Sequence, residues 1–356
     1  MRYYRIPSFS CIEGHRNKPE RGTMRVVEGC IPYPVGGLRS GPVWTTLGTF
    51  ADLNDQVSYA TDDAGNKYLF VSYSNFYALH VFPASTDYPK MGAALVGTPS
   101  LSILENTFTG WLGSTKAYSS NIGSRQVAIG NGGTNPLIID MTSDSVVTVD
   151  VTDSDIYEMS RVEFPYCTMF VRGPGKCLFG AGNPSSPLSV YVSEPAGANE
   201  IQRDSLYSSG TLSKVDMLMT DATKITALST LGPYVVVHTD NGVSLLYGSS
   251  PDQADTGFRV EQVASPVSSG AVNQRVVGGI SSQPFFLARD GQIYKDESTT
   301  AGPDGKPLYS DPRQVSWKAK GLWSDVSAED ISSSFASYDP GIGMYFVYLP
   351  TKEAES

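Results

Sequence analysis

A two-strand pattern recurs along this chain of 356 residues: an apolar run, a turn that in most copies contains glycine, and a second apolar run. The five clearest copies are Tyr68 to Phe82, Gln126 to Met141, Tyr234 to Tyr247, Pro284 to Tyr294 and Ser334 to Leu349. Each copy is typical of a β-hairpin, because apolar and β-branched runs flank a short turn, which in three copies contains Asn-Gly, Asp-Gly or Gly-Gly and tolerates positive φ. Repetition of one such unit predicts sheets that repeat radially, as in a β-propeller.

The spacing of these hairpins predicts how many sheets the chain forms. One gap between them is about twice as long as the others, and a sixth unit, Cys167 to Glu194, fills it. We therefore expect an all-β chain folded as a propeller of six or seven blades, with a seventh blade assembled from the N-terminal arm and the C-terminal strands. Long polar inter-strand loops are expected at Thr86 to Leu104, Asn106 to Arg125, Pro195 to Asp221 and Asp296 to Gln314.

The chain divides into three parts on this interpretation. Residues 1–50 are predicted to form an extended N-terminal arm that leads into the first blade, because Pro32 and Pro34 exclude a helix there. Residues 51–350 form the propeller, and residues 351–356 form a C-terminal tail. Short helices are expected only around Thr223 to Thr230 and Ser327 to Ser333, since helical periodicity is otherwise nearly absent.

The charge balance limits the partners of this chain. Lys and Arg number 26 against 36 Asp and Glu, a net charge of −10. Proteins that grip nucleic acid through its phosphates need a cationic surface, so the charge balance argues against this mode of binding. An acidic wall past which nucleic acid slides without sticking is compatible with the charge. An ordinary solvated surface is the alternative interpretation.

Cysteine and histidine usage argues against a metal site. The four cysteines (Cys11, Cys30, Cys167 and Cys177) lack a C-x-x-C spacing, and the chain has 3 histidines. We expect no metal, no cofactor, and reduced, partly buried thiols. The opening residues lack the apolar core of a signal peptide, and no apolar run reaches membrane-spanning length. Synthesis and first folding are therefore expected in a cytoplasm.

The candidate catalytic residues of this chain each have a simpler structural role. His15 lies in a basic tract, His80 on an apolar strand, and His238 beside a hairpin turn. A core or turn histidine is the favoured interpretation for the last two. Paired carboxylates of a glycosidase are the second option. The candidate carboxylates all fall in hairpin turns, where Asp is favoured for structural reasons, so we expect no catalytic residues. These carboxylates are Asp62, Asp63, Asp240 and Asp290.

Three further patterns have structural explanations. Thr61 to Tyr68 loosely resembles the Asp-box turn of sialidases, which is a folding element of that family. The glycine-rich segments Gly130 to Pro136 and Arg172 to Cys177 precede no helix pattern and are interpreted as hairpin turns rather than phosphate loops. Aromatic residues such as Tyr345 to Tyr348 alternate along strands and are expected to fill the spaces between blades.

A basic N-terminal tract stands out in this acidic chain and is a candidate surface for docking on an acidic neighbouring subunit. A merely solvated terminus is the open alternative. Long loops are natural contact elements on a propeller, so the Pro195 to Asp221 and Asp296 to Gln314 loops are included in the same hypothesis. The predicted subunit-interface residues are Arg2, Arg5, Arg16, Arg21, Arg25, Asp304 and Lys306.

Four motifs in succession resemble one family over roughly residues 30–350. They are GGLRSGP (Gly36 to Pro42), VYVSEP (Val190 to Pro195), FFLARDGQIY (Phe285 to Tyr294) and YDPGIGMYFVYLP (Tyr338 to Pro350). Their order is similar to that in the propeller-bearing tail proteins of short-tailed bacteriophages, called tail nozzle, tubular tail or packaged-DNA-stabilising proteins. The chain departs from the family in ending soon after the last motif and in lacking the insertions of larger members.

The resemblance implies a structural virion protein with no enzymatic activity. It implies a homo-oligomeric ring, a hexamer, around the DNA exit channel of the tail, assembled in the host cytoplasm. Adaptor or portal-side proteins and fibre or needle-side proteins would be its virion partners, and genomic DNA would pass through the lumen without sequence-specific binding. Two alternatives stay open: a glycan-binding propeller of a host-recognition fibre, and a glycoside hydrolase.

Overall fold

The structure is a computed structural model. It describes residues 30–33, 37–40, 53–61, 67–73, 76–82, 102–106, 118–121, 126–130, 132, 137–140, 156–158, 167–173, 177–192, 213–217, 221–247, 259–262, 270–280, 283–301, 307–315, 327–339 and 344–348.

Five four-stranded antiparallel sheets follow one another along the described parts of the chain, and in each the strands pair in chain order. The first contains β3 (Leu53–Thr61), β4 (Lys67–Tyr73), β5 (Phe76–Phe82) and β6 (Ser102–Asn106). The second contains β7 (Tyr118–Asn121), β8 (Gln126–Gly130), β9 (Leu137–Asp140) and β10 (Ile156–Glu158). The third contains β11 (Met169–Arg172), β12 (Leu178–Ala181), β13 (Ser189–Val192) and β14 (Ser213–Asp216).

The fourth sheet contains β15 (Ile225–Leu231), β16 (Tyr234–Thr239), β17 (Gly242–Tyr247) and β18 (Arg259–Gln262). The fifth contains β19 (Val277–Ile280), β20 (Gln283–Leu287), β21 (Ile293–Ala301) and β22 (Pro307–Gln314). A two-stranded sheet of β23 (Phe335–Asp339) and β24 (Met344–Tyr348) comes next. A separate hairpin pairs β1 (Cys30–Tyr33) with β2 (Gly37–Ser40).

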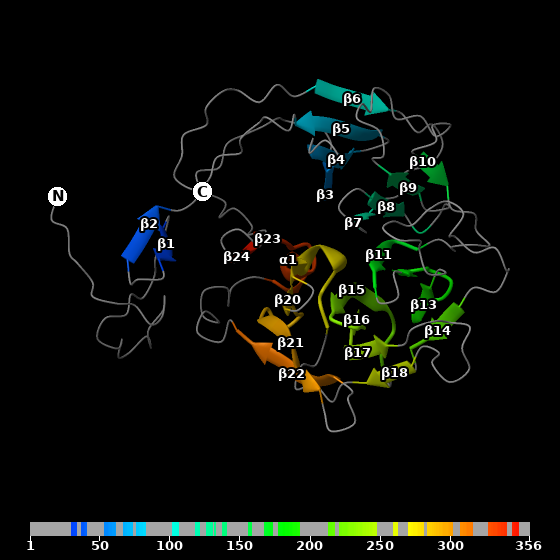
Figure 1. The fold of residues 1–356 in the computed structure, drawn as a ribbon, viewed down its shortest axis with the longest axis vertical. Helices are drawn as coiled ribbons and strands as arrows, with labels where there is room; N and C mark the ends of the chain where they lie inside the picture. The colour runs from blue at the N-terminus through cyan, green and yellow to red at the C-terminus, as the bar shows by residue number, and fades with distance from the viewer. Residues whose placement is uncertain are drawn as a thin grey trace.

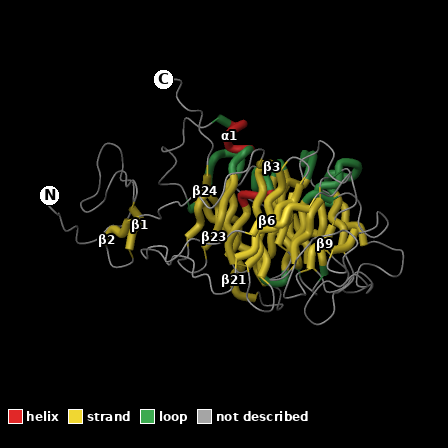
Figure 2. Tube along the Cα trace, turned by 90° about the horizontal axis from the view of Figure 1, so that it is seen from above, coloured by secondary structure: helices red, strands yellow, loops and turns green. Residues whose placement is uncertain are grey.

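The sheets are arranged around a common axis, as in a propeller (Figure 1). The first strand of each sheet contacts the first strand of the next, through β3, β7, β11, β15, β19 and β23. These strands therefore lie innermost, and the later strands of each sheet lie progressively outward. Seen from the side, the strands form one layer with short helices at its edge (Figure 2). The helices are the 3-10 helix η3 (Gln274–Val276) and α1 (Ala328–Ser332).

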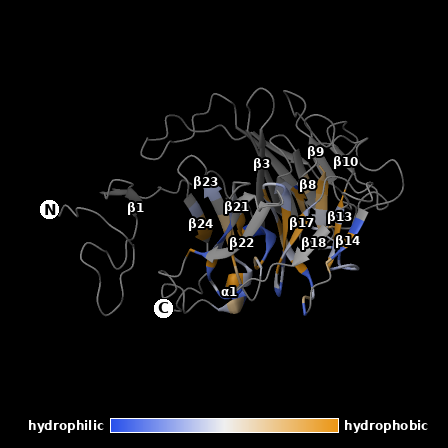
Figure 3. Cartoon of the chain, turned by 60° about the horizontal axis from the view of Figure 1, so that its bottom comes forward, coloured by the Kyte–Doolittle hydropathy of each residue, from blue (hydrophilic) through white to orange (hydrophobic). Residues whose placement is uncertain are grey.

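The β15–β18 sheet shows why these residues form strands that are buried on both faces. Every residue of β16, YVVVHT, is buried. Val235 and Val237 pack toward the β11–β14 sheet, whereas Tyr234 and Val236 pack toward the β19–β22 sheet. Successive side chains point to opposite faces of a strand, so an uninterrupted β-branched run supplies two cores at once. Figure 3 shows hydrophobic residues along the strands of this sheet and polar ones in the turns.

The structure confirms the expected all-β chain and each of the six predicted hairpin units. It pairs β4 with β5, β8 with β9, β11 with β12, β16 with β17, β20 with β21, and β23 with β24. The helix expected at Ser327 to Ser333 is confirmed as α1. The division at residues 50 and 350 stays a prediction.

Two expectations about local structure were wrong. Thr223 to Thr230 was expected to be helical, but it contributes to strand β15, where β-branched Ile225 and Thr226 are buried against neighbouring strands. Asp296 to Gln314 was expected to be a loop, but β21 and β22 pair through most of it. An outer strand can form its backbone hydrogen bonds without an apolar sequence. The polar composition of this segment therefore gave no indication that it forms strands. Strands β6, β7 and β14 likewise lie within or at the ends of the other predicted loops.

Candidate functional site

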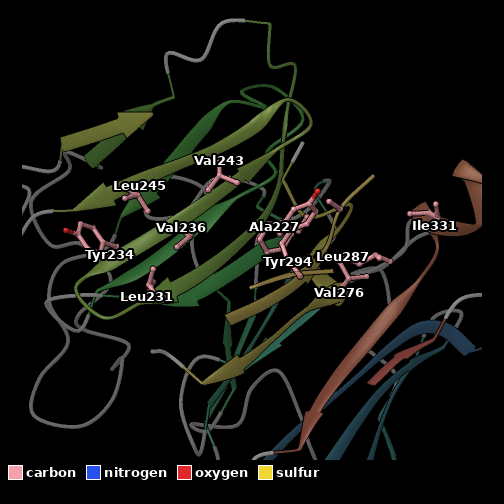
Figure 4. Close-up of a cluster of buried hydrophobic side chains, with 13 residues drawn as sticks. Ala227, Leu231, Tyr234, Val236, Val243, Leu245, Val276, Leu287, Tyr294 and Ile331 are labelled. Carbon is pink, nitrogen blue, oxygen red and sulfur yellow. The ribbon is translucent and has the colours of Figure 1, made fainter. Parts of the chain in front are cut away.

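A short segment between the fourth and fifth sheets makes polar contacts with three consecutive sheets. We call residues 270–276 the clasp. It begins beside the turn that ends β16, passes through a bridge between Ala271 and Ala288, and ends in η3, which leads directly into β19. Val276 at the end of the clasp belongs to one buried apolar cluster with Ala227 of β15 and Ile331 of α1 (Figure 4).

The clasp is bonded to the innermost strand of the preceding sheet. The Gln274 side chain accepts from the Leu228 N–H at 2.7 Å and donates to the Leu228 carbonyl at 3.0 Å. The Thr226 hydroxyl donates to the Ala271 carbonyl at 2.6 Å. These bonds satisfy backbone groups of β15 with a side chain of the clasp, and a backbone group of the clasp with a side chain of β15. Because the clasp leads directly into β19, they fix the fourth and fifth sheets relative to each other.

The clasp is also bonded to the segment that leads into the last sheet. The Asn273 side-chain amide donates to the Ser332 carbonyl at 2.8 Å and to the Ser334 carbonyl at 3.1 Å. The side-chain oxygen of Asn273, Oδ1, accepts from the Arg275 N–H at 2.8 Å and thereby caps η3. The Tyr345 hydroxyl of β24 donates to the Val276 carbonyl. Both polar atoms of the Asn273 side chain therefore have structural roles: the oxygen caps η3, and the nitrogen binds the segment that leads into the last sheet.

Replacing Gln274 with alanine should lower the free energy of unfolding by about 2 kcal/mol, because two buried backbone groups of Leu228 lose their partner at once. Ser332→Ala is the matched control, since its exposed hydroxyl bonds only within α1, to the Glu329 carbonyl. Its effect should stay within about 0.5 kcal/mol. Urea unfolding followed by circular dichroism measures both, and equal effects of the two substitutions would contradict the role given to Gln274.

His238 lies next to the clasp and is fully buried. Its Nε2 lies 3.1 Å from the Ser229 hydroxyl, and its ring lies 4.7 Å from that of Phe286. Burial lowers the pKa of His238 from its ordinary 6.5 to about 3, because the charged form would lose its hydration. The expectation of a core histidine is confirmed, and such a ring is neutral and out of reach of solvent at neutral pH.

Gly270 explains why the clasp can approach His238 so closely. A Cβ on Gly270 would lie 2.7 Å from His238 Cβ and 2.8 Å from His238 Cα. Backbone atoms cannot yield as a flexible side chain can, so a side chain at this position would push the clasp away from β16. The Gly270 N–H also donates to the Thr239 carbonyl at 2.9 Å.

The carboxylates in the described turns have structural partners. Asp240 accepts from the N–H groups of Thr223 at 2.8 Å and Lys224 at 3.3 Å. Burial alone would raise the pKa of Asp240, but these bonds, the Thr223 hydroxyl and the nearby Arg289 together lower it. Asp290 accepts from the Gln292 N–H at 2.9 Å and from the Tyr294 hydroxyl at 2.6 Å. Their predicted role as turn residues is confirmed.

Aromatic side chains fill the space between the fifth and last sheets, as expected. The Phe285 ring stacks on Tyr345 at 5.5 Å and on Tyr338 at 6.0 Å between ring centroids. Burial raises the pKa of Tyr345, whose hydroxyl is used by the clasp. Because these rings present their faces to one another, they are occupied in packing rather than held open as a platform for a sugar ring.

Cys167 and Cys177 are buried thiols, as expected. Burial raises the pKa of Cys167 well above its ordinary value and that of Cys177 to about 11. Thiols with such raised pKa values are inert packing groups. Within the part of the chain that the structure describes, no group of three His, Cys, Asp or Glu side chains is placed to bind a metal ion. Nor does any helix there have the length and apolar character needed to cross a membrane.

The residues predicted at a subunit interface lie outside the described residues, as do His15, Asp62, Asp63 and Cys11. The interface residues in question are Arg2, Arg5, Arg16, Arg21, Arg25, Asp304 and Lys306. Conversely, sequence reasoning overlooked Asn273 and Gln274. The signal for them was a polar Asn-Gln-Arg tripeptide set between the apolar pairs Ala271–Val272 and Val276–Val277, which no turn rule required.

Comparisons with known proteins return structural likenesses of low identity. No family model matches the chain, and no curated protein matches it in sequence. A streptogramin B lyase structure is similar at 10% identity and a TM-score of 0.42, covering 89% of this chain and 81% of the lyase.

Two further structures show similar levels of likeness. A candidate 6-phosphogluconolactonase from Bacteroides fragilis has 10% identity and a TM-score of 0.37, with 73% of this chain and 80% of that chain covered. A protein from Lactobacillus plantarum has 10% identity and a TM-score of 0.38, with 71% and 83% covered. At these levels the likenesses carry no argument about the activity of this chain.

Proposed function

We propose that this chain is a structural protein of a short-tailed bacteriophage virion. In this proposal it forms the wall of the tail nozzle as a homo-oligomeric ring, a hexamer, around the DNA exit channel. Its role is mechanical and not catalytic: it retains packaged DNA and conducts it during ejection. Portal-side adaptors and fibre or needle proteins would contact the two ends of the ring.

The observation that carries this proposal is the clasp. Gln274 and Asn273 lock three consecutive sheets together through backbone groups, at distances of 2.7–3.1 Å. A wall that resists the pressure of packed DNA needs sheets that do not slide past one another, and such bonds oppose sliding. The buried His238 and the turn carboxylates Asp240 and Asp290 likewise serve packing and turns.

Two sequence features add support. The four motifs shared with nozzle proteins fall on or beside strands of four different sheets: β2, β13, β20–β21 and β23–β24. The resemblance thus extends along the fold instead of being confined to one hairpin. The net charge of −10 suits a channel through which phosphates must pass without binding. We also propose six blades, the last built on β23–β24.

Ring assembly of the purified protein tests this function. Mass photometry and negative-stain electron microscopy should show rings of one size with an open centre. Monomers at every concentration and salt condition would overturn the proposal. Binding to a glycan array by monomers would instead support the host-recognition alternative.

Charge reversal in the N-terminal tract tests the predicted interface within that ring. Replacing Arg2, Arg5, Arg16, Arg21 and Arg25 together with glutamate should abolish rings, because the tract would then repel an acidic neighbour. The unfolding temperature measured in dilute solution should stay within a few degrees of the parent value, since solvated charges contribute little to folding. Replacing the same five with lysine is the control and should preserve assembly.

A further inference from the structure

Among the described strands, those of the last sheet around the axis are fewer than those of the five sheets before it. Each of the five preceding sheets has four strands, whereas β24 has β23 as its one neighbour among the described strands. Because β23 contacts β19, which lies innermost in its own sheet, β24 occupies the second position outward. Two outer positions of this sheet therefore have no described strand.

The composition of β24 is that of an interior strand. The outermost strands β6, β10, β14, β18 and β22 each carry at least one charged residue: Glu105, Glu158, Asp216, Glu261 and Arg313. Strand β24, MYFVY, carries none, like four of the five strands in the second position, β8, β12, β16 and β20; the fifth, β4, carries Lys67 at its start. Natural sheets protect exposed edges with charge, and an apolar edge without it pairs readily with another strand.

The β1–β2 hairpin has the properties that the missing positions require. Strand β1, CIPY, is uncharged, like the third-position strands β5, β13 and β17, and β2, GLRS, carries Arg39 as in an outermost position. Both views of the molecule place this hairpin on the side of the ring where β23 and β24 lie (Figures 1 and 2).

The connection from β2 to β3 also fits. Ser40 ends β2 and Leu53 begins β3, which leaves 12 residues between them. The links that join an outermost strand to the next innermost strand range from 8 residues, between β14 and β15, to 20, between β22 and β23. In the order β23-β24-β1-β2, each strand runs antiparallel to its neighbour, and β2 ends where β3 must start, as in the other sheets.

We propose that the β1–β2 hairpin is a strap that docks along β24 of its own chain and completes the last sheet in the order β23-β24-β1-β2. The N-terminal part of the chain thereby closes the ring onto its C-terminal strands instead of contributing to a seventh blade. The proposal goes beyond the nozzle function and does not depend on it. Pro32 has no N–H, so one bond is lost at that position, but Pro284 already occupies the interior strand β20.

Disulfide formation by the natural Cys30 tests this arrangement. Cys30 begins β1, so in an antiparallel pair it lies opposite the end of β24. In a Cys11→Ser background, oxidation of Val347→Cys or Tyr348→Cys should give an internal disulfide in a monomer, seen as faster non-reducing migration and a mass loss of about 2 Da. Met344→Cys is the control and should stay reduced, since it lies about 13 Å further along the strand.

The outcomes separate the strap from its alternatives. A covalent dimer would show that the hairpin comes from a second copy, and cross-linking through Met344→Cys as efficient as through Tyr348→Cys would show no fixed register. Either result overturns the proposal, as does no cross-link at all. Hydrogen exchange gives a second reading: amides of β24 should exchange at least about tenfold faster in Leu38→Pro than in the parent chain. Equal rates would also overturn it.

Discussion

Replacing Phe286 with alanine is expected to lower the free energy of unfolding by about 3–5 kcal/mol, the range for a large aromatic side chain removed from a packed core. Phe286 on β20 is fully buried between the fourth and fifth sheets. Its ring lies 4.7 Å from His238 and 5.6 Å from Tyr294 between centroids. Removing it leaves a cavity between two strands whose backbones are fixed by pairing on both sides, so the site cannot collapse to fill it.

Phe335→Ala is the matched control, because Phe335 begins β23 and is 46% exposed. The same chemical change there should cost less than about 1 kcal/mol. Equilibrium unfolding in guanidinium chloride, with tryptophan fluorescence and circular dichroism as parallel probes, measures both variants. If Phe286→Ala cost no more than Phe335→Ala, the contact between the fourth and fifth sheets would not be the packed core described above.

Stability is expected to fall by about 2 kcal/mol between pH 8 and pH 5 on account of His238 alone. Its pKa is about 3 in the folded chain against 6.5 when solvated. Between these two values the unfolded chain binds a proton that the folded chain does not. Stability therefore rises with pH through this window, and the penalty grows from near pH 6.5 until it levels off near pH 3.

His238→Gln isolates this contribution, since glutamine has a polar side chain that does not titrate. Thermal unfolding at intervals of half a pH unit from 5 to 8 should give a clearly flatter profile for the variant than for the parent chain. Carboxylates titrate mainly below this range, so they do not obscure the comparison. Identical slopes in the two proteins would mean that His238 is reached by solvent and binds its proton in the folded state.

The apolar hairpins were predictable from sequence because their signals are local. In β16–β17, the run YVVVHT, the turn around Gly242 and the run GVSLLY together specify two paired strands without reference to any other part of the chain. The buried state of His238 followed from its place in that run. The turn role of Asp290 followed from its position before Gly291, which has a φ of 73°.

The outer strands and the clasp were not predictable in the same way. Strand β22, PLYSDPRQ, is held by backbone bonds to β21, and no apolar period records that pairing. Gln274 acquires its importance from Leu228, 46 residues earlier in the chain. A contact between two sheets depends on how they are placed around the axis, and that information is spread over the sequences of both sheets.

The long reach of Asn273 has a consequence for how the protein is made. The two carbonyls that receive its amide protons belong to residues 59 and 61 positions further along the chain. A ribosome will have released the first five sheets well before Ser332 and Ser334 emerge from its exit tunnel. The nascent protein can therefore form this junction only after Ser332 and Ser334 have been made, and a product that stopped before them would leave the Asn273 amide without these two acceptors.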